Sequence, residues 1–120
     1  MKKMKAFNVA GVTFRNKPID SMTRLDLISK YCSHGSDFYL EREPDNSFDE
    51  NAVQVRQLFK SGGSIQLGYV PKKFSEEFAC LMDYHAWNPE IKFGRKFIDE
   101  KTGDCKGMQL RYEPYGENLE

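Results

Sequence analysis

The most informative stretch of the chain is LEREPDNSFDENAVQV, residues 40–55. It joins two segments of strand character through a loop rich in Pro, Asp, Asn and Ser, with one aromatic residue, Phe48, in the middle. Asp and Asn side chains hydrogen-bond their own backbone in turns, and Pro fixes the backbone angle φ, so we expect a tightly structured loop. An aromatic residue followed directly by an acid, here Phe48 and Asp49, can offer a stacking face beside a carboxylate that binds a hydroxyl group.

Strand patterns flank this loop and recur along the chain. Runs rich in β-branched and aromatic residues, bounded by turn residues, are typical of strands. The predicted strands are residues 5–14, 37–42, 52–59, 65–70, 90–98 and 106–113. Gly11, inside the first of them, indicates a bulge or a close approach of another backbone segment. Hairpin turns are predicted at 61–64 (SGGS) and 101–104 (KTGD).

Two segments have helical periodicity instead. The first predicted helix spans residues 20–31, and Asp20 or Ser21 can cap it. The second spans residues 71–84 and begins at Pro71, which suits the first turn because its missing N–H is not needed there. Strands and helices without βαβ alternation predict an α+β protein, mostly antiparallel sheet, in the form of a small, partly open barrel.

Composition predicts one globular domain over residues 1–120. The chain is 39% hydrophobic, 30% charged and 13% aromatic, and it is long enough for its own core. No apolar run approaches the roughly 20 residues that span a bilayer. The basic start, residues 1–5, is not followed by the apolar segment of a secretory signal. We therefore expect a cytoplasmic protein, with a frayed tail at residues 114–120.

The net charge of zero argues against a nucleic-acid partner, but the charges are unevenly distributed. Residues 1–17 carry five bases and no acid, and residues 51–75 carry four bases and no acid. Residues 37–50 carry six acids against a single base. Such blocks can build a local basic face on a neutral protein, or they can form a mosaic of solvated charges.

Catalytic and metal-binding patterns are absent from the sequence. The three cysteines, Cys32, Cys80 and Cys105, are far apart and form no CxxC pair, which predicts reduced thiols with at least one buried. There is no Gly-rich phosphate loop and no nucleophile elbow. Clustered acids in residues 41–50 leave a weak divalent-metal site as an alternative, although EF-hand spacing is missing. We expect a non-enzymatic protein without cofactor or metal.

The sequence REPDN at residues 42–46, followed by Asp49 and by NAV at 51–53, resembles the core motif of the HIRAN domain family. LGYVP at 67–71 and the small-Gly pair at 10–11 stand at matching positions. The resemblance implies an OB-like, six-stranded, partly open antiparallel barrel with two helices, in agreement with the strand pattern.

The resemblance covers residues 7–82, about two thirds of the chain, and the predicted hairpin at 90–113 fits the family's architecture without carrying a motif. Better-known members attach this domain to a helicase-like ATPase, whereas we expect it to stand alone here. The family is known for reading DNA ends. It therefore implies recognition of single-stranded DNA 3′ ends, in DNA repair or replication-fork processing.

The family's binding residues can be carried onto matching positions of this sequence. Aromatic residues sandwich the terminal base, an acid accepts a hydrogen bond from the free 3′-hydroxyl, and polar and basic groups hold the phosphates. The implied nucleic-acid-binding residues are Phe14 and Phe48 for stacking, Asp49 for the hydroxyl, Asn46, Tyr69 and Lys72 along the phosphate path, and Arg15 as a nearby base.

This chain departs from the DNA-binding members at several positions. Phe replaces Tyr at both stacking positions, which keeps the aromatic face and loses a hydroxyl. Thr13 stands where a basic residue contacts phosphate, Asp45 replaces an Asn and adds negative charge, and Tyr69 replaces a His. These changes weaken the grip on the backbone more than the stacking.

The same residues have ordinary structural interpretations. Phe48 can plug the edge of the core, Phe14 and Tyr69 can be strand packing, and Asp49 and Asn51 can cap the turn. Two other functions also stay open. One is a protein-interaction adaptor whose loop grips a peptide or an ATPase, and the other is a regulatory subunit of a separate helicase or nuclease.

Overall fold

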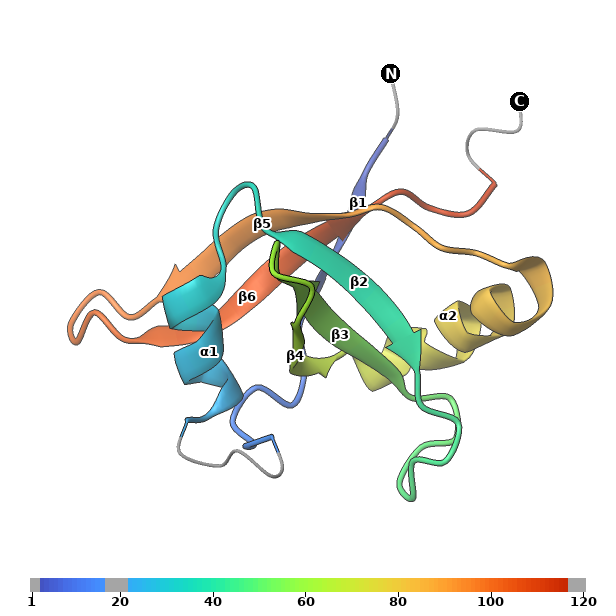
Figure 1. Ribbon diagram of the computed structural model, residues 1–120, viewed down its shortest axis with the longest axis horizontal. Helices are drawn as coiled ribbons and strands as arrows, with labels where there is room; N and C mark the ends of the chain where they lie inside the picture. The colour runs from blue at the N-terminus through green and yellow to red at the C-terminus, as the bar shows by residue number, and fades with distance from the viewer. Residues whose placement is uncertain (1–2, 17–21, 117–120) are drawn as a thin grey trace.

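Six strands and two helices follow one another in the computed structural model, which describes residues 3–16 and 22–116. The strands are β1 (Lys5–Asn8), β2 (Asp37–Arg42), β3 (Val53–Leu58), β4 (Ser64–Tyr69), β5 (Ile91–Ile98) and β6 (Cys105–Tyr112), and the helices are α1 (Arg24–Tyr31) and α2 (Lys72–His85). The strands form one antiparallel sheet of order β1-β6-β5-β2-β3-β4 (Figure 1). The predicted α+β, mostly antiparallel architecture is confirmed.

The sheet curls into a partly open barrel. At one seam, Ala10, just after β1, exchanges two backbone hydrogen bonds of 2.8 and 2.9 Å with Tyr69 at the end of β4. Gly68 permits this approach, because a Cβ atom there would lie 2.3 Å from the carbonyl oxygen of Ala10. At the other seam, β2 and β5 meet at a single residue pair, Phe38 and Ile91. The OB-like, partly open barrel that the sequence predicted is therefore present.

The first strand is shorter than predicted. β1 ends at Asn8, and Gly11 adopts a φ of 69°, a left-handed conformation that favours glycine and turns the chain out of the sheet. The carbonyl oxygens of Val12 and Phe14 then accept the backbone N–H groups of Leu25 and Arg24, each at 2.9 Å. Phe14 thus lies in a loop that is tied to the start of α1, and not in a strand.

The helix α1 begins at Arg24, later than the predicted residue 20. Thr23 is its N-cap: the Thr23 hydroxyl accepts the backbone N–H of Asp26 at 3.2 Å, and the Asp26 carboxylate accepts that of Thr23 at 2.9 Å. This reciprocal capping box satisfies two N–H groups that the helix leaves unpaired. The predicted caps, Asp20 and Ser21, lie outside the described residues.

The helix α2 confirms the second predicted helix and supplies the centre of the core. Its Phe78 is fully buried, and its ring makes edge contacts with Trp87 and Tyr112, at centroid distances of 4.8 and 5.1 Å. Phe7 of β1 approaches the same ring at 6.0 Å. Burying such a side chain contributes about 1.5–3 kcal/mol, so α2 and the first and last strands are held together here.

The thiols and the end of the chain complete the fold. Cys32 is buried, Cys80 and Cys105 are not, and all three are free, as predicted. Burial raises the pKa of Cys32 to about 12. Pro114 is buried and the Tyr115 ring lies 5.4 Å from that of His85, whereas residues 117–120 of the predicted frayed tail lie outside the described residues. Neither described helix is long and apolar enough to cross a membrane.

Candidate nucleic-acid interface

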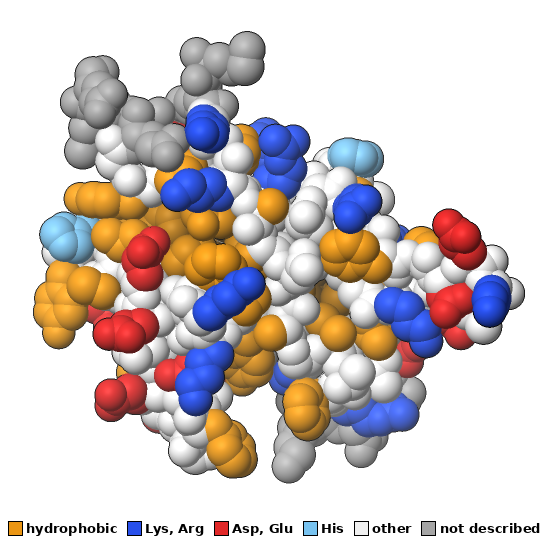
Figure 2. Space-filling view, turned by 180° about the vertical axis from the view of Figure 1, so that it is seen from behind, with side chains coloured by type: hydrophobic (Ala, Val, Ile, Leu, Met, Phe, Trp, Pro, Cys, Tyr) orange, Lys and Arg blue, Asp and Glu red, His pale blue; other side chains and the backbone are white. Residues whose placement is uncertain are grey.

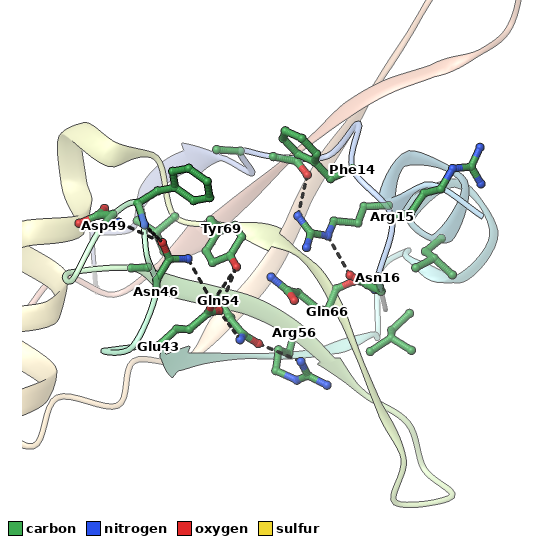
Figure 3. A pocket seen from close by; sticks show the side chains of 18 of the residues that line it. Phe14, Arg15, Asn16, Glu43, Asn46, Asp49, Gln54, Arg56, Gln66 and Tyr69 are labelled. Atoms are coloured by element: carbon green, nitrogen blue, oxygen red, sulfur yellow. Dashed lines mark hydrogen bonds between the residues drawn. The ribbon is translucent and has the colours of Figure 1, made fainter. Parts of the chain in front are cut away.

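A cavity of about 1040 Å³ runs along β3 and β4. Two loops wall it, residues 10–16 before α1 and residues 43–49 between β2 and β3 (Figure 3). All seven residues that the sequence nominated line this cavity: Phe14, Arg15, Asn46, Phe48, Asp49, Tyr69 and Lys72. The structure therefore brings together residues from three separate parts of the chain.

The two nominated aromatic residues are strongly exposed. Phe48 is 92% exposed and Phe14 is 65% exposed. Rings with this exposure are not part of the core, so the interpretations of Phe48 as a core plug and of Phe14 as strand packing are wrong. An exposed aromatic residue at the mouth of a cavity is typical of a stacking surface for bases.

The loop that carries Phe48 is organised by Asn46, which confirms the tightly structured loop that the sequence predicted. The side-chain oxygen of Asn46 accepts the backbone N–H groups of Phe48 and Asp49, at 2.8 and 3.0 Å. Its amide nitrogen donates to the Glu43 carboxylate at 3.1 Å. These contacts fix the direction in which Phe48 leaves the loop. The side-chain oxygen of Asn46 is therefore engaged in holding the loop, and Asn46 supports the site by fixing the loop conformation.

Asp49 faces the cavity while it anchors the loop. One carboxylate oxygen accepts the backbone N–H of Asn51 at 2.9 Å, as in the turn-capping interpretation. The other lies 3.0 Å from the hydroxyl of Ser75, a buried residue in the first turns of α2. The carboxylate is thus held in place by two separate elements, and each oxygen retains a further lone pair for a ligand.

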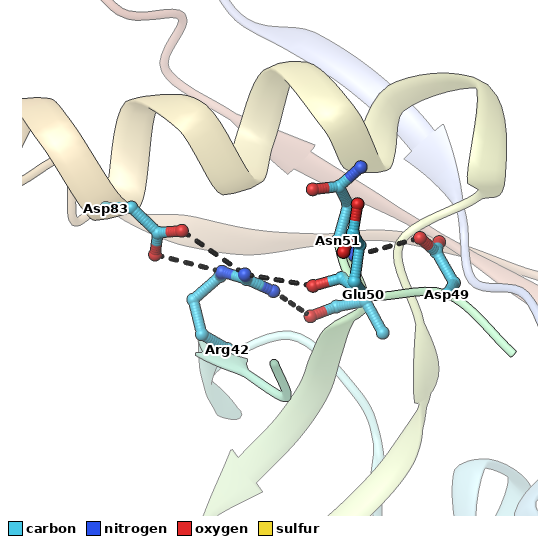
Figure 4. Close-up of polar contacts among 6 residues, drawn as sticks. Arg42, Asp49, Glu50, Asn51 and Asp83 are labelled. Carbon is cyan, nitrogen blue, oxygen red and sulfur yellow. Dashed lines mark hydrogen bonds and ion pairs between the residues drawn. The ribbon is translucent and has the colours of Figure 1, made fainter. Parts of the chain in front are cut away.

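The far end of the same loop is fastened by Arg42 (Figure 4). The Arg42 guanidinium donates to the backbone carbonyls of Ala52 and Glu50, at 2.7 and 3.1 Å. It also pairs with Asp83 of α2 at 3.0 Å. The loop between β2 and β3 is therefore attached to α2 at two points, through Arg42 and through Asp49.

Glu43 lines the cavity beside Tyr69, although sequence reasoning gave it no role in binding nucleic acid. Its carboxylate accepts hydrogen bonds from the Tyr69 hydroxyl at 2.9 Å, from Asn46 and from the Gln54 amide. Burial raises the pKa of Glu43, but these hydrogen bonds and the charge of Arg24 outweigh it and hold the pKa below its usual value. Glu43 therefore stays ionised and fixes the Tyr69 side chain.

Arg24 holds the loop of residues 10–16 at the cavity, and sequence reasoning did not identify it either. It is 8% exposed, and its guanidinium donates to the Gly11 carbonyl and the Asn16 side chain, each at 2.9 Å. It lies 5.4 Å from the centre of the Tyr69 ring. Burial lowers the pKa of Arg24, against the opposing effects of Tyr69 and Glu43. The signal available in the sequence was an Arg at a position of a short helix that faces inward, where a charged side chain needs polar partners.

With this geometry in place, comparisons with known proteins identify the family. The HIRAN domain model matches residues 4–109. The chain belongs to the HIRAN domain family. The match reaches beyond the motif region of residues 7–82 and takes in most of the β5–β6 hairpin. Membership of the HIRAN family supports a DNA-binding module.

Two solved structures resemble this HIRAN domain. The crystal structure of the HIRAN domain of human HLTF is 18% identical, covers 96% of this chain and 78% of that chain, and superposes with a TM-score of 0.52. A protein from Lactobacillus plantarum is 20% identical, covers 93% and 100% of the two chains, and gives a TM-score of 0.50. Identities this low show the shared fold alone. No curated protein matches the chain.

The charged rim of this HIRAN domain is mixed. Lys72, exposed at the first residue of α2, lines the cavity, and so does Asp45 in the loop of residues 43–49. The first turn of α2 contains two lysines and no acid, and its N-cap, Pro71, makes no side-chain cap. Helix N-termini favour negative charge, so these lysines are locally unfavourable for stability. No three described His, Cys, Asp or Glu residues form a group that could hold a metal ion.

Proposed function

We propose that this HIRAN domain binds single-stranded DNA at a free 3′ end. The observation that carries the proposal is the presence of two exposed aromatic rings, Phe14 and Phe48, at one cavity that also contains the carboxylate of Asp49. Stacking of a base on an aromatic side chain contributes about 1–3 kcal/mol and tolerates any sequence. Two such rings therefore suit a terminal base whose identity varies.

Selectivity for the end follows from the charge of Asp49. A carboxylate accepts a hydrogen bond from a terminal 3′-hydroxyl, whereas it repels a 3′-phosphate or the phosphodiester of a continuing strand. Such selectivity arises from repulsion of the wrong ligand as well as attraction of the right one. The two anchors of the carboxylate, Asn51 and Ser75, keep it in one position for this discrimination.

The phosphates preceding the terminal nucleotide are held at the start of α2 and on the loop before α1. Lys72 supplies a positive charge at the cavity rim, next to N–H groups at a helix N-terminus that favour anions. Arg15 lines the same cavity from the other loop. The unfavourable position of Lys72 for helix stability supports a role in binding, because local rules are broken most often at functional sites.

The test is a titration of 5′-labelled oligothymidines that end in a 3′-hydroxyl or a 3′-phosphate, followed by fluorescence anisotropy. The wild type is expected to bind the hydroxyl end more tightly. Asp49→Asn keeps an oxygen for the Asn51 N–H but removes the charge, so it is expected to bind both ends alike. Asp104→Asn, in the distant β5–β6 turn, is the matched control. Equal wild-type affinity for both ends would overturn the proposal.

A 3′-hydroxyl end reader fits a non-catalytic role in DNA repair or replication-fork processing, where such ends arise. HIRAN domains are typically non-catalytic on their own. The domain would then mark the end for an enzyme carried on another chain, such as a helicase or a nuclease. Co-purification with such an enzyme only in the presence of 3′-hydroxyl DNA would support this role.

A protein-interaction adaptor is the second candidate. Figure 2 shows hydrophobic side chains gathered on the side of the molecule where α2 lies. Tyr84 near the end of α2 is 81% exposed, and Tyr115 is 43% exposed. Salt separates the two candidates, because DNA binding weakens steeply as salt rises, whereas a mainly apolar protein contact changes little.

A further inference from the structure

The cavity extends well beyond the residues that would read a 3′ end. In Figure 3, Asp49 and Asn46 lie at one end of it, Asn16 and Gln66 lie at the other, and Tyr69 lies between them. The part beyond Tyr69, here called the distal half, is lined by Asn16, Met22, Leu27, Arg56, Ser64, Ile65 and Gln66. The whole cavity of about 1040 Å³ reaches the upper end of the ~300–1,000 Å³ range of sites for drug-sized ligands. A terminal nucleotide at Asp49 leaves the distal half free.

Arg56 is held in the distal half as a fixed donor. Its Nε donates to the Tyr39 hydroxyl at 3.1 Å, one terminal nitrogen donates to the Gln54 side-chain oxygen at 2.9 Å, and the other donates to the Ser64 hydroxyl at 3.1 Å. These partners come from β2, β3 and β4, and none of them is charged. A guanidinium has five N–H groups, so one N–H remains on each terminal nitrogen. Arg56 is partly buried, and its position is set before any ligand arrives.

The walls around Arg56 suit a flat ring more than a phosphate. Met22, Leu27 and Ile65 are apolar, partly buried and face the cavity. Apolar walls with a few converging polar groups are the usual lining of a site for an organic ligand. A phosphate loses hydration among such side chains, whereas the faces of a nucleobase are themselves apolar. The distal half therefore favours a base.

We propose that the distal half binds the base of a nucleotide upstream of the 3′ end and prefers guanine through Arg56. The two remaining N–H donors of the guanidinium match the O6 and N7 acceptors of guanine, the commonest specific contact that arginine makes with a base. Adenine presents a donor beside N7, and the two carbonyl oxygens of thymine are separated by an N–H donor, so neither base accepts both N–H groups. Cytosine is the one competitor, because its Watson–Crick edge carries two adjacent acceptors, O2 and N3. In a single strand these base edges are accessible. This inference rests on the proposed function, to which it adds a sequence preference.

The experiment places a single guanine at each of the last four positions of a 5′-labelled oligothymidine with a 3′-hydroxyl. At one internal position, guanine is expected to bind at least about fivefold more tightly than thymine or adenine, the lower bound for one two-pronged contact, with cytosine as the closest competitor. Arg56→Lys keeps the charge and loses the fork, so the preference should disappear while the salt dependence stays. Arg111→Lys, exposed on β6 and outside the cavity lining, is the matched control.

Equal affinity for the four bases at every position would overturn the inference, and so would a preference that survives Arg56→Lys. Ser64→Ala removes one anchor of the guanidinium and leaves its charge, so it should weaken the preference for guanine. This variant replaces Arg56→Lys if Arg56→Lys is too unstable to assay. The same strands with a 3′-phosphate separate the two proposals. A guanine preference without discrimination between the two 3′ ends would overturn the proposed function and leave this inference. Discrimination between the ends without a base preference would overturn this inference and leave the proposed function.

Discussion

Two groups of aromatic side chains in this domain have opposite surroundings. Phe78 is fully buried and packs on Trp87 and Tyr112, whereas Phe14 and Phe48 are 65% and 92% exposed at the cavity. The same ring that stabilises the fold when buried adds nothing to the core when exposed. Residue type alone therefore does not assign a role to an aromatic side chain. The hydrogen bonds that hold a loop in place decide whether its aromatic residue packs inward or faces a ligand.

The largest effect is expected in the buried group. Phe78→Ala should lower the free energy of unfolding by about 3–5 kcal/mol, because it leaves a cavity among four other rings. Domains of this size have total stabilities of about 5–15 kcal/mol, so the variant should be marginal or unfolded. Urea denaturation followed by circular dichroism measures the change. A cost below about 1 kcal/mol would contradict the central position of Phe78.

A smaller effect, of a different kind, is expected for Phe48→Ala. Affinity for single-stranded DNA should fall by about 1–3 kcal/mol, because one stacking face is lost. The free energy of unfolding should change by less than about 0.5 kcal/mol, as for most surface substitutions. Tyr84→Ala, at a residue that is also strongly exposed but lies outside the cavity lining, is the control and should leave DNA affinity unchanged. Loss of stability without loss of DNA affinity would show that Phe48 supports the fold and not the binding site.

The smallest effect is expected for Lys72→Ala. It should weaken binding of all single strands alike and flatten the slope of log affinity against log salt by about one unit. Stability should be unchanged or rise by up to about 1 kcal/mol, because a lysine leaves the positive end of the α2 dipole. Salt-dependent anisotropy and thermal unfolding measure the two quantities, with Lys101→Ala in the β5–β6 turn as control. An unchanged slope would exclude Lys72 from the phosphate path.

Much of the fold was predictable from local patterns. The strand at residues 37–42 was placed at its observed bounds, and the second helix was placed within one residue, because alternation and helical spacing are local properties. The start of α1 was misplaced, although Thr23 and Asp26 stand at capping-box spacing and mark it in the sequence. The early end of β1 depends on the left-handed Gly11, which predicted a bulge or a close approach of another backbone segment and not the end of the strand.

The residues that line the cavity were predictable only where they belong to the sequence motif. The resemblance supplied Phe48 and Asp49, but nothing local indicated that Glu43 would meet Tyr69 or that Arg56 would contact three strands. These contacts join residues far apart in the chain, and they exist only after the barrel has closed. Exposure of Phe48 was likewise unpredictable, because an aromatic residue in a polar loop is consistent with either burial or exposure.

The seam between Ala10 and Tyr69 also sets an order of assembly. The β2, β3 and β4 strands are neighbours in sequence, so the half of the site with Phe48 can form through short-range contacts. The loop with Phe14 follows β1, which pairs with β6 from the other end of the chain, and contacts so distant are entropically slow to form. We therefore expect the loops that carry Phe14 and Phe48 to come together only in the last step of folding. A molecule that has not finished folding has no complete site with which to capture a strand.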